Sequence, residues 1–218
     1  MKVLISFGPV RAYIDEVRFI TNRSTGTLGY KILEAALLRR HEVKAVVGVC
    51  DFLRPQGVKD WIEVEEYQDL WDVMHDNYDW AEVIIMGAAV PDFLPEKKVP
   101  GKISRAKGEL VLKLKASDSI LGSLARRKKR NRKLIVGFSL EKENPIQEAI
   151  RKFQEHRLDL MASAVLDEKI PPFGGNPLSL VLIEKEKIER LPLWRKYKTG
   201  EYILNRIEEI WYRKFLRK

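Results

Sequence analysis

The chain has 218 residues, of which 45% are hydrophobic and 33% charged, and its formal net charge is +9. This length suits one domain with a substantial core, spanning residues 1–218, and the composition excludes a disordered protein. No apolar run approaches the roughly 20 residues of a membrane span, and the N-terminus MKVLIS lacks a signal-peptide layout, so we expect a cytoplasmic protein. The single cysteine, Cys50, excludes an intrachain disulfide framework and a cysteine-cluster zinc site.

In chain order, short apolar segments alternate with amphipathic ones. Strands are expected at residues 3–6, 43–49, 61–64, 81–90, 134–139, 158–166 and 178–183. Helices are expected at residues 28–40, 69–76, 119–125 and 201–216, with a further one opened by Asn144 and Pro145. The run AEVIIMGAAV at 81–90 is continuously apolar, which is typical of a central strand buried on both faces. The alternation predicts an α/β fold: a Rossmann-like, doubly wound, mainly parallel sheet with helices on both faces.

Residues 91–117 interrupt this alternation. Glu109–Lys115 alternates apolar and charged residues, which predicts a half-exposed strand, and we expect it to pair with Lys102–Arg105 through a turn at 106–108. Prolines before this strand indicate an irregular connection. We interpret the segment as an antiparallel hairpin or flap on the α/β body; decoration, a dimerisation arm and an active-site cover remain open as its role.

The basic balance favours polyanionic partners, which are nucleic acids, membrane surfaces or small phosphorylated substrates. The densest basic run, residues 126–133, follows an apolar helical segment and is interpreted as the last turn of that helix, where cations complement the helix dipole. A nucleic-acid patch is the alternative, but the chain lacks zinc-finger spacing and an aromatic RNP motif. We therefore expect small-molecule substrates and neither nucleic acid nor membrane as a partner.

The stretch VRFITNRSTGTLGY, residues 17–30, gathers hydrogen-bonding side chains just before a helix. Ser24-Thr25-Gly26 could be a plain N-cap, but a cap needs one acceptor, and Arg18 and Asn22 go beyond it. Open parallel sheets bind ligands at the carboxyl ends of their strands, and a helix N-terminus suits phosphate. Small residues after other strands let a backbone approach a ligand closely; they are Gly8, Gly87, Ala88, Ala89 and Gly137. The absence of G-x-G-x-x-G and Walker A sequences argues against ordinary NAD binding and P-loop phosphoryl transfer.

Four motifs, GPVRAYIDEVRFITNRSTGTLG, GAAVPDF, PGKISR and VGFSLE, occur in an order that resembles the phosphopantothenoylcysteine synthetase (phosphopantothenate–cysteine ligase) family. In bacteria this family is often the C-terminal half of a bifunctional coenzyme A flavoprotein, and the resemblance spans nearly the whole chain. It implies that CTP or ATP, with Mg²⁺, activates 4′-phosphopantothenate as an acyl-nucleotide with loss of pyrophosphate, and that the cysteine amine then displaces the nucleotide. It also implies a homodimer that holds no flavin and no metal of its own.

The resemblance further implies the roles of individual residues. Asn22 would hold the acyl-nucleotide and support the second half-reaction, and Arg18 would stabilise the substrate anion. Lys102 would be the catalytic lysine of the flap, where it neutralises charge on the triphosphate, and the flap would be a lid that could reach a second subunit. The expected nucleotide-binding residues are Gly8, Ser24, Gly26, Gly87, Ala88, Ala89, Asp92, Gly137, Phe138 and Lys152.

Three single positions depart from the family pattern: Val10 stands where threonine is usual, Ala164 where asparagine is typical, and His156 where a second lysine is usual. In addition, the lysine-rich tail of the flap motif is thinned to Ser104-Arg105. Three alternatives remain beside the ligase: a nucleotide-binding homologue without catalysis, a Rossmann-like NADPH-dependent reductase, and a nucleic-acid-binding protein that would use residues 126–133. His41, His75 and His156 show no metal-ligand spacing, so we expect no protein-held metal.

Overall fold

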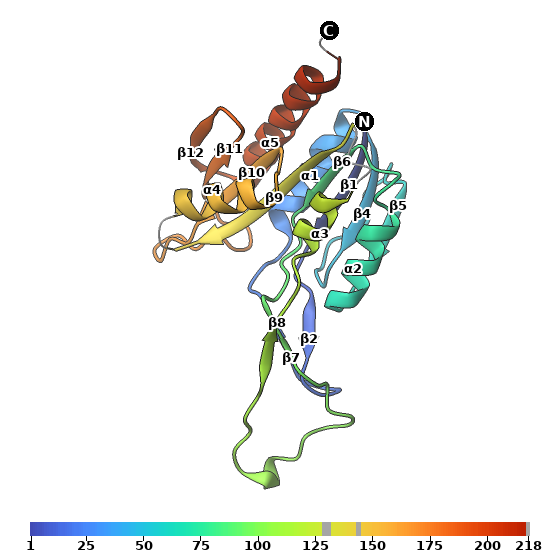
Figure 1. The fold of residues 1–218 in the computed structure, drawn as a ribbon, viewed down its shortest axis with the longest axis vertical. Helices are drawn as coiled ribbons and strands as arrows, with labels where there is room; N and C mark the ends of the chain where they lie inside the picture. The colour runs from blue at the N-terminus through green and yellow to red at the C-terminus, as the bar shows by residue number, and fades with distance from the viewer. Residues whose placement is uncertain (128–131, 143–144, 217–218) are drawn as a thin grey trace.

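The computed structural model describes residues 1–127, 132–142 and 145–216. Within them, an eight-stranded sheet has the order β12-β11-β10-β9-β6-β1-β4-β5 (Figure 1). The strands are β1 (Lys2–Phe7), β4 (Glu42–Val47), β5 (Asp60–Glu63), β6 (Val83–Met86), β9 (Leu134–Glu141), β10 (Leu160–Val165), β11 (Leu178–Ile183) and β12 (Ile188–Trp194). The strands from β10 to β5 in that order are parallel, whereas β11 and β12 pair antiparallel. This sheet confirms the predicted doubly wound, mainly parallel α/β fold.

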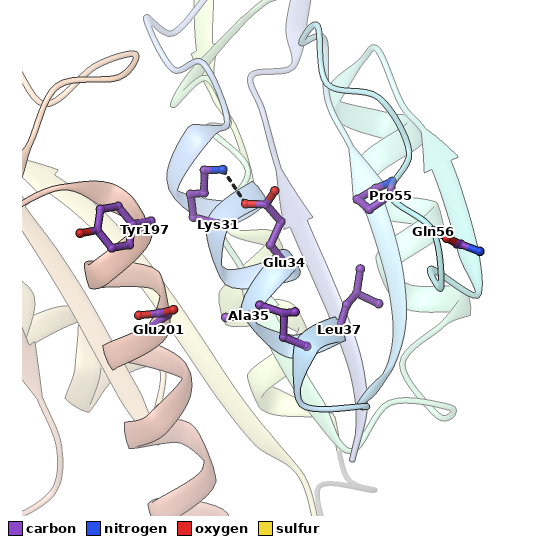
Figure 2. A pocket seen from close by; sticks show the side chains of 9 residues that line it. Lys31, Glu34, Ala35, Leu37, Pro55, Gln56, Tyr197 and Glu201 are labelled. Atoms are coloured by element: carbon purple, nitrogen blue, oxygen red, sulfur yellow. Dashed lines mark hydrogen bonds and ion pairs between the residues drawn. The ribbon is translucent and has the colours of Figure 1, made fainter.

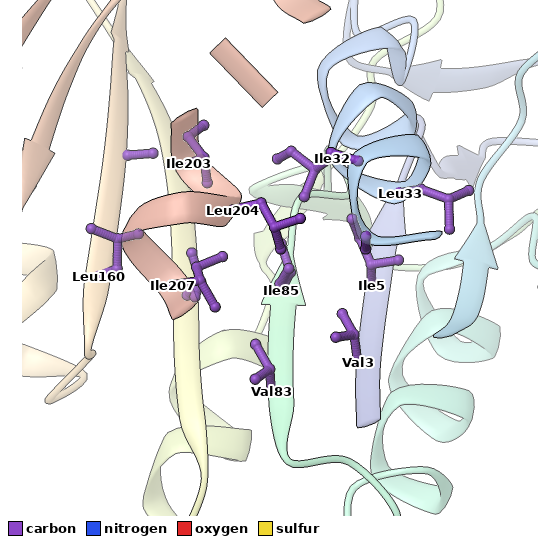
Figure 3. Close-up of a cluster of buried hydrophobic side chains, with 14 of the residues drawn as sticks. Val3, Ile5, Ile32, Leu33, Val83, Ile85, Leu160, Ile203, Leu204 and Ile207 are labelled. Carbon is purple, nitrogen blue, oxygen red and sulfur yellow. The ribbon is translucent and has the colours of Figure 1, made fainter. Parts of the chain in front are cut away.

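Helices cover both faces of the sheet. One face carries α1 (Thr27–Leu38) and α5 (Lys196–Trp211), and the other carries α2 (Tyr67–Asp76), α3 (Ile120–Arg126) and α4 (Pro145–Glu155). Because successive side chains of a strand point to opposite faces, Val3 and Ile5 pack toward α1 (Figure 3). Leu4, between them, packs toward α2 on the other face. Each fully buried side chain of this kind contributes about 1.5–3 kcal/mol to folding. These two layers hold the strand ends in place.

The strand order reverses between β1 and β6. From β1 the chain moves outward through β4 to β5, and then returns to β6 on the other side of β1 before it continues to β9 and β10. The connections that follow β1 and β6 lead to opposite sides of this reversal, which is the usual ligand site of such sheets. The strand β6 is shorter than the predicted 81–90: it ends at Met86, and beyond it a parallel bridge between Pro9 and Ala89 keeps the chain beside the segment that follows β1.

Two antiparallel strand pairs lie outside the main sheet, and they extend away from its helix-covered body (Figure 1). The first, a hairpin that the sequence did not predict, pairs β2 (Arg11–Tyr13) with β3 (Phe19–Thr21). The second pairs β7 (Phe93–Pro95) with β8 (Leu114–Ala116) and forms the base of a projection that we call the arm, residues 91–117. The arm corresponds to the predicted flap.

The predicted pairing within the arm is wrong. The partner of Leu114–Ala116 is β7, not Lys102–Arg105. Residues Arg105–Lys107 instead form a 3₁₀ turn, in which Ser104 Oγ accepts a hydrogen bond from Ala106 N at 3.2 Å. An alternation of apolar and charged residues identifies an extended segment but carries no information about its partner.

The remaining differences concern the ends of elements. The closing helix starts at Lys196, earlier than predicted, and a π-helical turn, Tyr212–Leu216, continues it. The strand β12 was not predicted. Of the basic run 126–133, Arg126 lies in the last turn of α3 as expected, whereas residues 128–131 lie outside the described residues. The predicted cap residue Asn144 lies outside them as well.

Candidate functional site

A cleft of about 800 Å³ lies at the carboxyl ends of β6, β9 and β10, within the size range of small-molecule sites. The first turn of α1, the first residues of α3 and the side chains of α4 contribute to its lining. It brings together most of the predicted site residues: Asn22, Ser24, Gly26, Gly87, Ala88, Ala89, Asp92, Phe138 and Lys152. His156 and Ala164, two of the positions that depart from the family pattern, also line it. The third, Val10, is fully buried in the core beneath α2.

The N-terminus of α1 opens onto this cleft without a side-chain cap. Its N-cap residue is Gly26, in the left-handed conformation with φ of 73°, and no side chain accepts a hydrogen bond from the first turn. Ser24 Oγ instead accepts from Gly26 N at 3.2 Å, and the Thr25 and Thr27 hydroxyls bond each other at 2.8 Å. The N-cap thus falls within Ser24-Thr25-Gly26, as the plain N-cap interpretation has it, but no side chain of this run caps the helix. Uncapped amides at a helix N-terminus are suited to bind an anion.

Asn22 connects two walls of the cleft. Its side-chain nitrogen Nδ2 donates to Val90 O at 2.9 Å, which ties the loop before α1 to the segment that follows β6. A primary amide has two N–H donors and one acceptor oxygen, so this bond leaves further polar groups for a ligand. Because Asn22 is exposed, a ligand in the cleft can reach them.

Gly8 and Gly137, which were expected to bind nucleotide, do not line the cleft. They lie behind its lining, where the lack of a side chain lets neighbouring segments pack closely. A Cβ on Gly137 would lie 2.8 Å from Leu121 Cδ2. Gly8, with φ of 85°, lies where two loops meet: a Cβ on Gly26 would lie 3.0 Å from Gly8 N, and Ala89 N donates to Gly8 O at 2.9 Å. The loops after β1 and β6 and the start of α1 thus support one another.

This close approach predicts the effect of Gly26→Ala. The substitution is expected to lower the free energy of unfolding by more than about 1 kcal/mol, because alanine must adopt a positive φ and also crowds Gly8. Gly101→Ala is the matched control, since Gly101 has φ of 71° but nothing within 4 Å of its Cβ position. Chemical denaturation of both variants measures the two costs. Equal losses of stability would show that the contact with Gly8 contributes nothing.

Ion pairs fix the positively charged side chains that α4 contributes to the cleft. Lys152 Nζ pairs with Glu141 Oε1 at 2.5 Å, and Arg151 bridges Glu148 at 3.0 Å and Glu155 at 2.7 Å. Lys152 is half-buried, so the pair with Glu141 fixes its ammonium at the end of β9. Lys152 therefore lies in the lining of the cleft, but the Glu141 carboxylate offsets its positive charge.

Lys196, in the first turn of α5, is a lining residue that the sequence analysis missed. Its side chain is buried, and its Nζ donates to Pro172 O at 3.0 Å and to Gly174 O. The guanidinium of Arg23 lies 4.8 Å from the ring centre of Phe173, so the same segment also contacts the loop before α1. A lysine in the first turn of a helix, where a cation opposes the dipole, is the sequence signal that could have drawn attention to it.

Burial lowers the pKa of Lys196 from 10.5 to about 8. The unfolded chain therefore binds more protons than the folded one between these two values, and the contribution of Lys196 to stability rises with pH across that window. We expect the free energy of unfolding to increase more in the wild type than in Lys196→Met when the pH rises from 8 to 10. Lys198→Met, which removes an exposed lysine of the same helix, should behave as the wild type does. Parallel curves for all three proteins would contradict the shift.

Arg18 and Lys102 do not line the cleft and lie together at the arm instead. Arg18 Nη1 pairs with Asp15 Oδ2 at 2.7 Å and donates to Ile103 O at 3.2 Å, next to the exposed Lys102. Of the three residues expected to be catalytic, the fold thus places Asn22 in the cleft, Lys102 on the arm, and Arg18 in the turn between β2 and β3, bonded to the arm. Asp15, which joins Arg18 to the arm, was not singled out by the sequence analysis.

A second hollow, of about 510 Å³, lies between α1, α5 and Pro55-Gln56 (Figure 2). Lys31 and Glu34 of α1 form an ion pair at its edge, and none of the expected site residues line it. Within the described ranges, no group of three or more histidine, cysteine, aspartate or glutamate side chains is placed to hold a metal ion. The helices formed by these residues are all too short or too polar to cross a membrane.

Residues 1–210 match the family model of the DNA/pantothenate metabolism flavoprotein C-terminal domain. The coenzyme A biosynthesis bifunctional protein CoaBC of Bacillus subtilis is 32% identical over 206 residues, which cover 94% of this chain and 50% of that protein. A cysteine/cysteine sulfinic acid decarboxylase of an unknown prokaryotic organism is 31% identical over 208 residues, which cover 94% of this chain and 57% of that protein. The chain thus spans about half the length of these curated relatives.

Solved structures share the fold of this chain. The crystal structure of the C-terminal domain of CoaBC superposes with a TM-score of 0.79 at 28% identity, covering 96% of this chain and 94% of that one. A Cab2 mutant in complex with phosphopantothenate-cysteine shares the fold, with a TM-score of 0.76 at 17% identity over 97% of this chain and 86% of that one. The chain therefore belongs to the DNA/pantothenate metabolism flavoprotein C-terminal domain family, which confirms the resemblance carried by its four motifs.

Proposed function

We propose that the chain is a phosphopantothenate–cysteine ligase of coenzyme A biosynthesis. The carboxylate oxygen of 4′-phosphopantothenate attacks the α-phosphorus of a nucleoside triphosphate, which forms an acyl-nucleotide and releases pyrophosphate. The cysteine amine then attacks the acyl carbon, an amide bond forms with loss of a proton, and the nucleoside monophosphate leaves. The observation that carries this proposal is the cleft at the strand reversal, which joins Asn22 to the uncapped N-terminus of α1 in a chain of this family.

The relatives support the choice of substrates. CoaBC is by its name a coenzyme A biosynthesis protein, and the Cab2 structure contains phosphopantothenate-cysteine. In the proposal, Gly87, Ala88 and Ala89 let the nucleotide approach the backbone, Asp92 contacts its base or ribose, and Phe138 lies on its other side. Ser24, Gly26 and Lys152 complete the nucleotide site, with Gly8 and Gly137 supporting it from behind.

We propose either CTP or ATP as the triphosphate, without a flavin. Mg²⁺ would enter with the nucleotide, because it keeps most of its ligands as water and phosphate oxygens and needs only one or two carboxylates. Asp118 lines the cleft and would supply such a carboxylate. Bound there, Mg²⁺ would offset the negative charge of the triphosphate.

We also propose that the protein is a homodimer in which the arm serves the cleft of the partner subunit. Two observations support this: Arg18 and Lys102 lie outside the cleft of their own chain, and the arm exposes apolar side chains. Contiguous exposed apolar surface typically marks a protein–protein contact. The exposed large apolar residues of the arm are Phe93, Val99, Leu110, Val111, Leu112 and Leu114.

Mixing two inactive variants tests this arrangement. If the arm acts across the dimer, an Asn22→Ala chain and a Lys102→Ala chain together restore one complete site in each mixed dimer. Equal mixing should then recover roughly a quarter of the wild-type turnover, because half of the dimers are mixed. If the arm acts within its own chain, both sites of a mixed dimer are defective and no activity returns. Sedimentation of the wild type provides the oligomeric state independently.

Pyrophosphate release tests the proposed function itself. The purified protein is incubated with Mg²⁺, 4′-phosphopantothenate and either CTP or ATP, with and without cysteine. Cysteine-dependent turnover with one nucleotide is the expected result and would identify that nucleotide. A single burst without cysteine would isolate the activation step. Nucleotide binding without any pyrophosphate release would instead identify a homologue that has lost catalysis.

A further inference from the structure

The turn between β2 and β3 contains a fully buried carboxylate, Asp15. A buried charge is costly unless hydrogen bonds and an opposite charge compensate it. Oδ1 accepts from Val17 N at 2.8 Å and from Arg18 N at 2.7 Å, and Oδ2 accepts from Arg18 Nη1 at 2.7 Å and from Ile103 N at 3.1 Å. Both oxygens are thus saturated, so the position of each partner is tightly defined.

These partners come from two segments that are far apart in sequence. Ile103 belongs to the arm, and its carbonyl oxygen also accepts from Arg18 Nη1 at 3.2 Å. Two backbone bonds reinforce the junction: Glu16 N donates to Gly101 O at 3.2 Å, and Val99 N donates to Ile14 O at 2.9 Å. Lys102 therefore lies between two bonded neighbours, Gly101 and Ile103.

A further ion pair holds the base of the arm to the body. Lys98 Nζ lies 2.9 Å from Glu66 Oε1, at the N-cap of α2. Beyond Ile103, the described residues of the arm bond mainly to one another, as in the turn at Arg105–Lys107. The tethered part of the arm thus ends at Ile103, and Asp15 provides its last link to the body.

We propose that Asp15 is a positioning residue that sets Arg18 and Lys102 in one geometry for the reaction. The inference rests on the proposed function and deepens it, because it explains how a lysine on a projecting arm keeps a defined place. Burial by itself would raise the pKa of the Asp15 carboxyl, but the backbone N–H donors and Arg18 outweigh it and hold the pKa at about 2. The carboxylate therefore stays ionised, and the tether intact, well below neutral pH.

Asp15→Asn is the central variant, with Asp159→Asn as its matched control. Asp159 also accepts a backbone amide, from Ile135 N at 2.8 Å, and pairs with Lys214 at 2.7 Å, but at the opposite end of the sheet strands. Asp15→Asn is expected to slow pyrophosphate release by about 100-fold, the cost of misplacing a catalytic group by about 1 Å. Asp159→Asn should retain the wild-type rate.

A double-mutant cycle separates positioning from a merely structural role. If Asp15 acts through Lys102, adding Asp15→Asn to a Lys102→Ala variant should slow pyrophosphate release by no more than about threefold, because coupled residues are strongly non-additive. The same 100-fold loss in both backgrounds would overturn the proposal. Thermal unfolding of each variant accounts for any loss of folded protein.

Two measurements do not depend on catalysis, so they distinguish failure of this inference from failure of the proposed function. Trypsin should cut after Lys102 about tenfold faster in Asp15→Asn than in Asp159→Asn, since a tether of charged hydrogen bonds is lost. In the unmutated protein, the Ile103 amide should exchange with deuterium more slowly than the Lys102 amide. Equal cleavage rates, or equal exchange of the two amides, would overturn the tether even if the ligase activity is absent.

Discussion

Replacing Asn22 with alanine is expected to lower cysteine-dependent turnover by about 10²–10³-fold, the cost of removing one donor that stabilises a developing charge. In the proposed reaction, Asn22 holds the acyl-nucleotide while the amine attacks. Its position supports this role, since Asn22 lines the cleft and its bond to Val90 O fixes the side chain. Because the first step does not require this contact, the burst of pyrophosphate should persist in the variant.

Asn176→Ala is the control for this prediction. Asn176 is also exposed, and its side-chain nitrogen also donates to a backbone carbonyl, Pro171 O at 3.0 Å, but it does not line the cleft. The control should keep the wild-type turnover and the wild-type burst. Loss of the burst in Asn22→Ala, with the control unaffected, would assign Asn22 to nucleotide activation and contradict its proposed role.

Replacing Lys102 with alanine is expected to act on the other half of the reaction. The proposed role of its ammonium is to neutralise charge that grows on the triphosphate, so its loss should slow pyrophosphate release by about 10²-fold. Stopped-flow detection of pyrophosphate in the absence of cysteine measures this step alone. Stability should change little, because Lys102 is exposed and its neighbours hold the backbone.

Lys113→Ala provides the matched control on the same arm. Lys113 is exposed and pairs with Glu96 at 3.2 Å, so its removal also takes one cation from the arm. An equal effect of both substitutions would mean that the net charge of the arm matters and the position of Lys102 does not. A normal burst in Lys102→Ala would remove this lysine from the activation step.

The strands and helices that could be predicted from the sequence are those whose apolar residues recur with a regular period. Apolar runs such as 81–90 identified the central strand, and amphipathic spacing identified α1, because both are set by local periodicity. The hairpin of β2 and β3 was missed since Arg11–Tyr13 and Phe19–Thr21 are too short to show a period. The partner of the arm strand was also beyond local reasoning, because it follows from bonds between segments distant in the chain.

The candidate site likewise contains residues that could be predicted from local sequence and residues that could not. Residues near the start of α1 and after β6 were found because they follow elements whose ends meet at a strand reversal. Lys196 and Asp15 were missed, since a buried lysine or aspartate looks like any surface charge until its partners are known. Gly8 and Gly137 were predicted to bind nucleotide, but their contacts show close packing and no place in the cleft lining.

The central claim is that this chain makes an amide bond between 4′-phosphopantothenate and cysteine. Mass spectrometry of the products, after incubation with Mg²⁺, both substrates and CTP or ATP, tests it most directly. The ligase account predicts a product with the mass of the two substrates less one water, formed in step with nucleoside monophosphate. Folded protein that binds nucleotide yet yields neither product nor monophosphate would contradict the account.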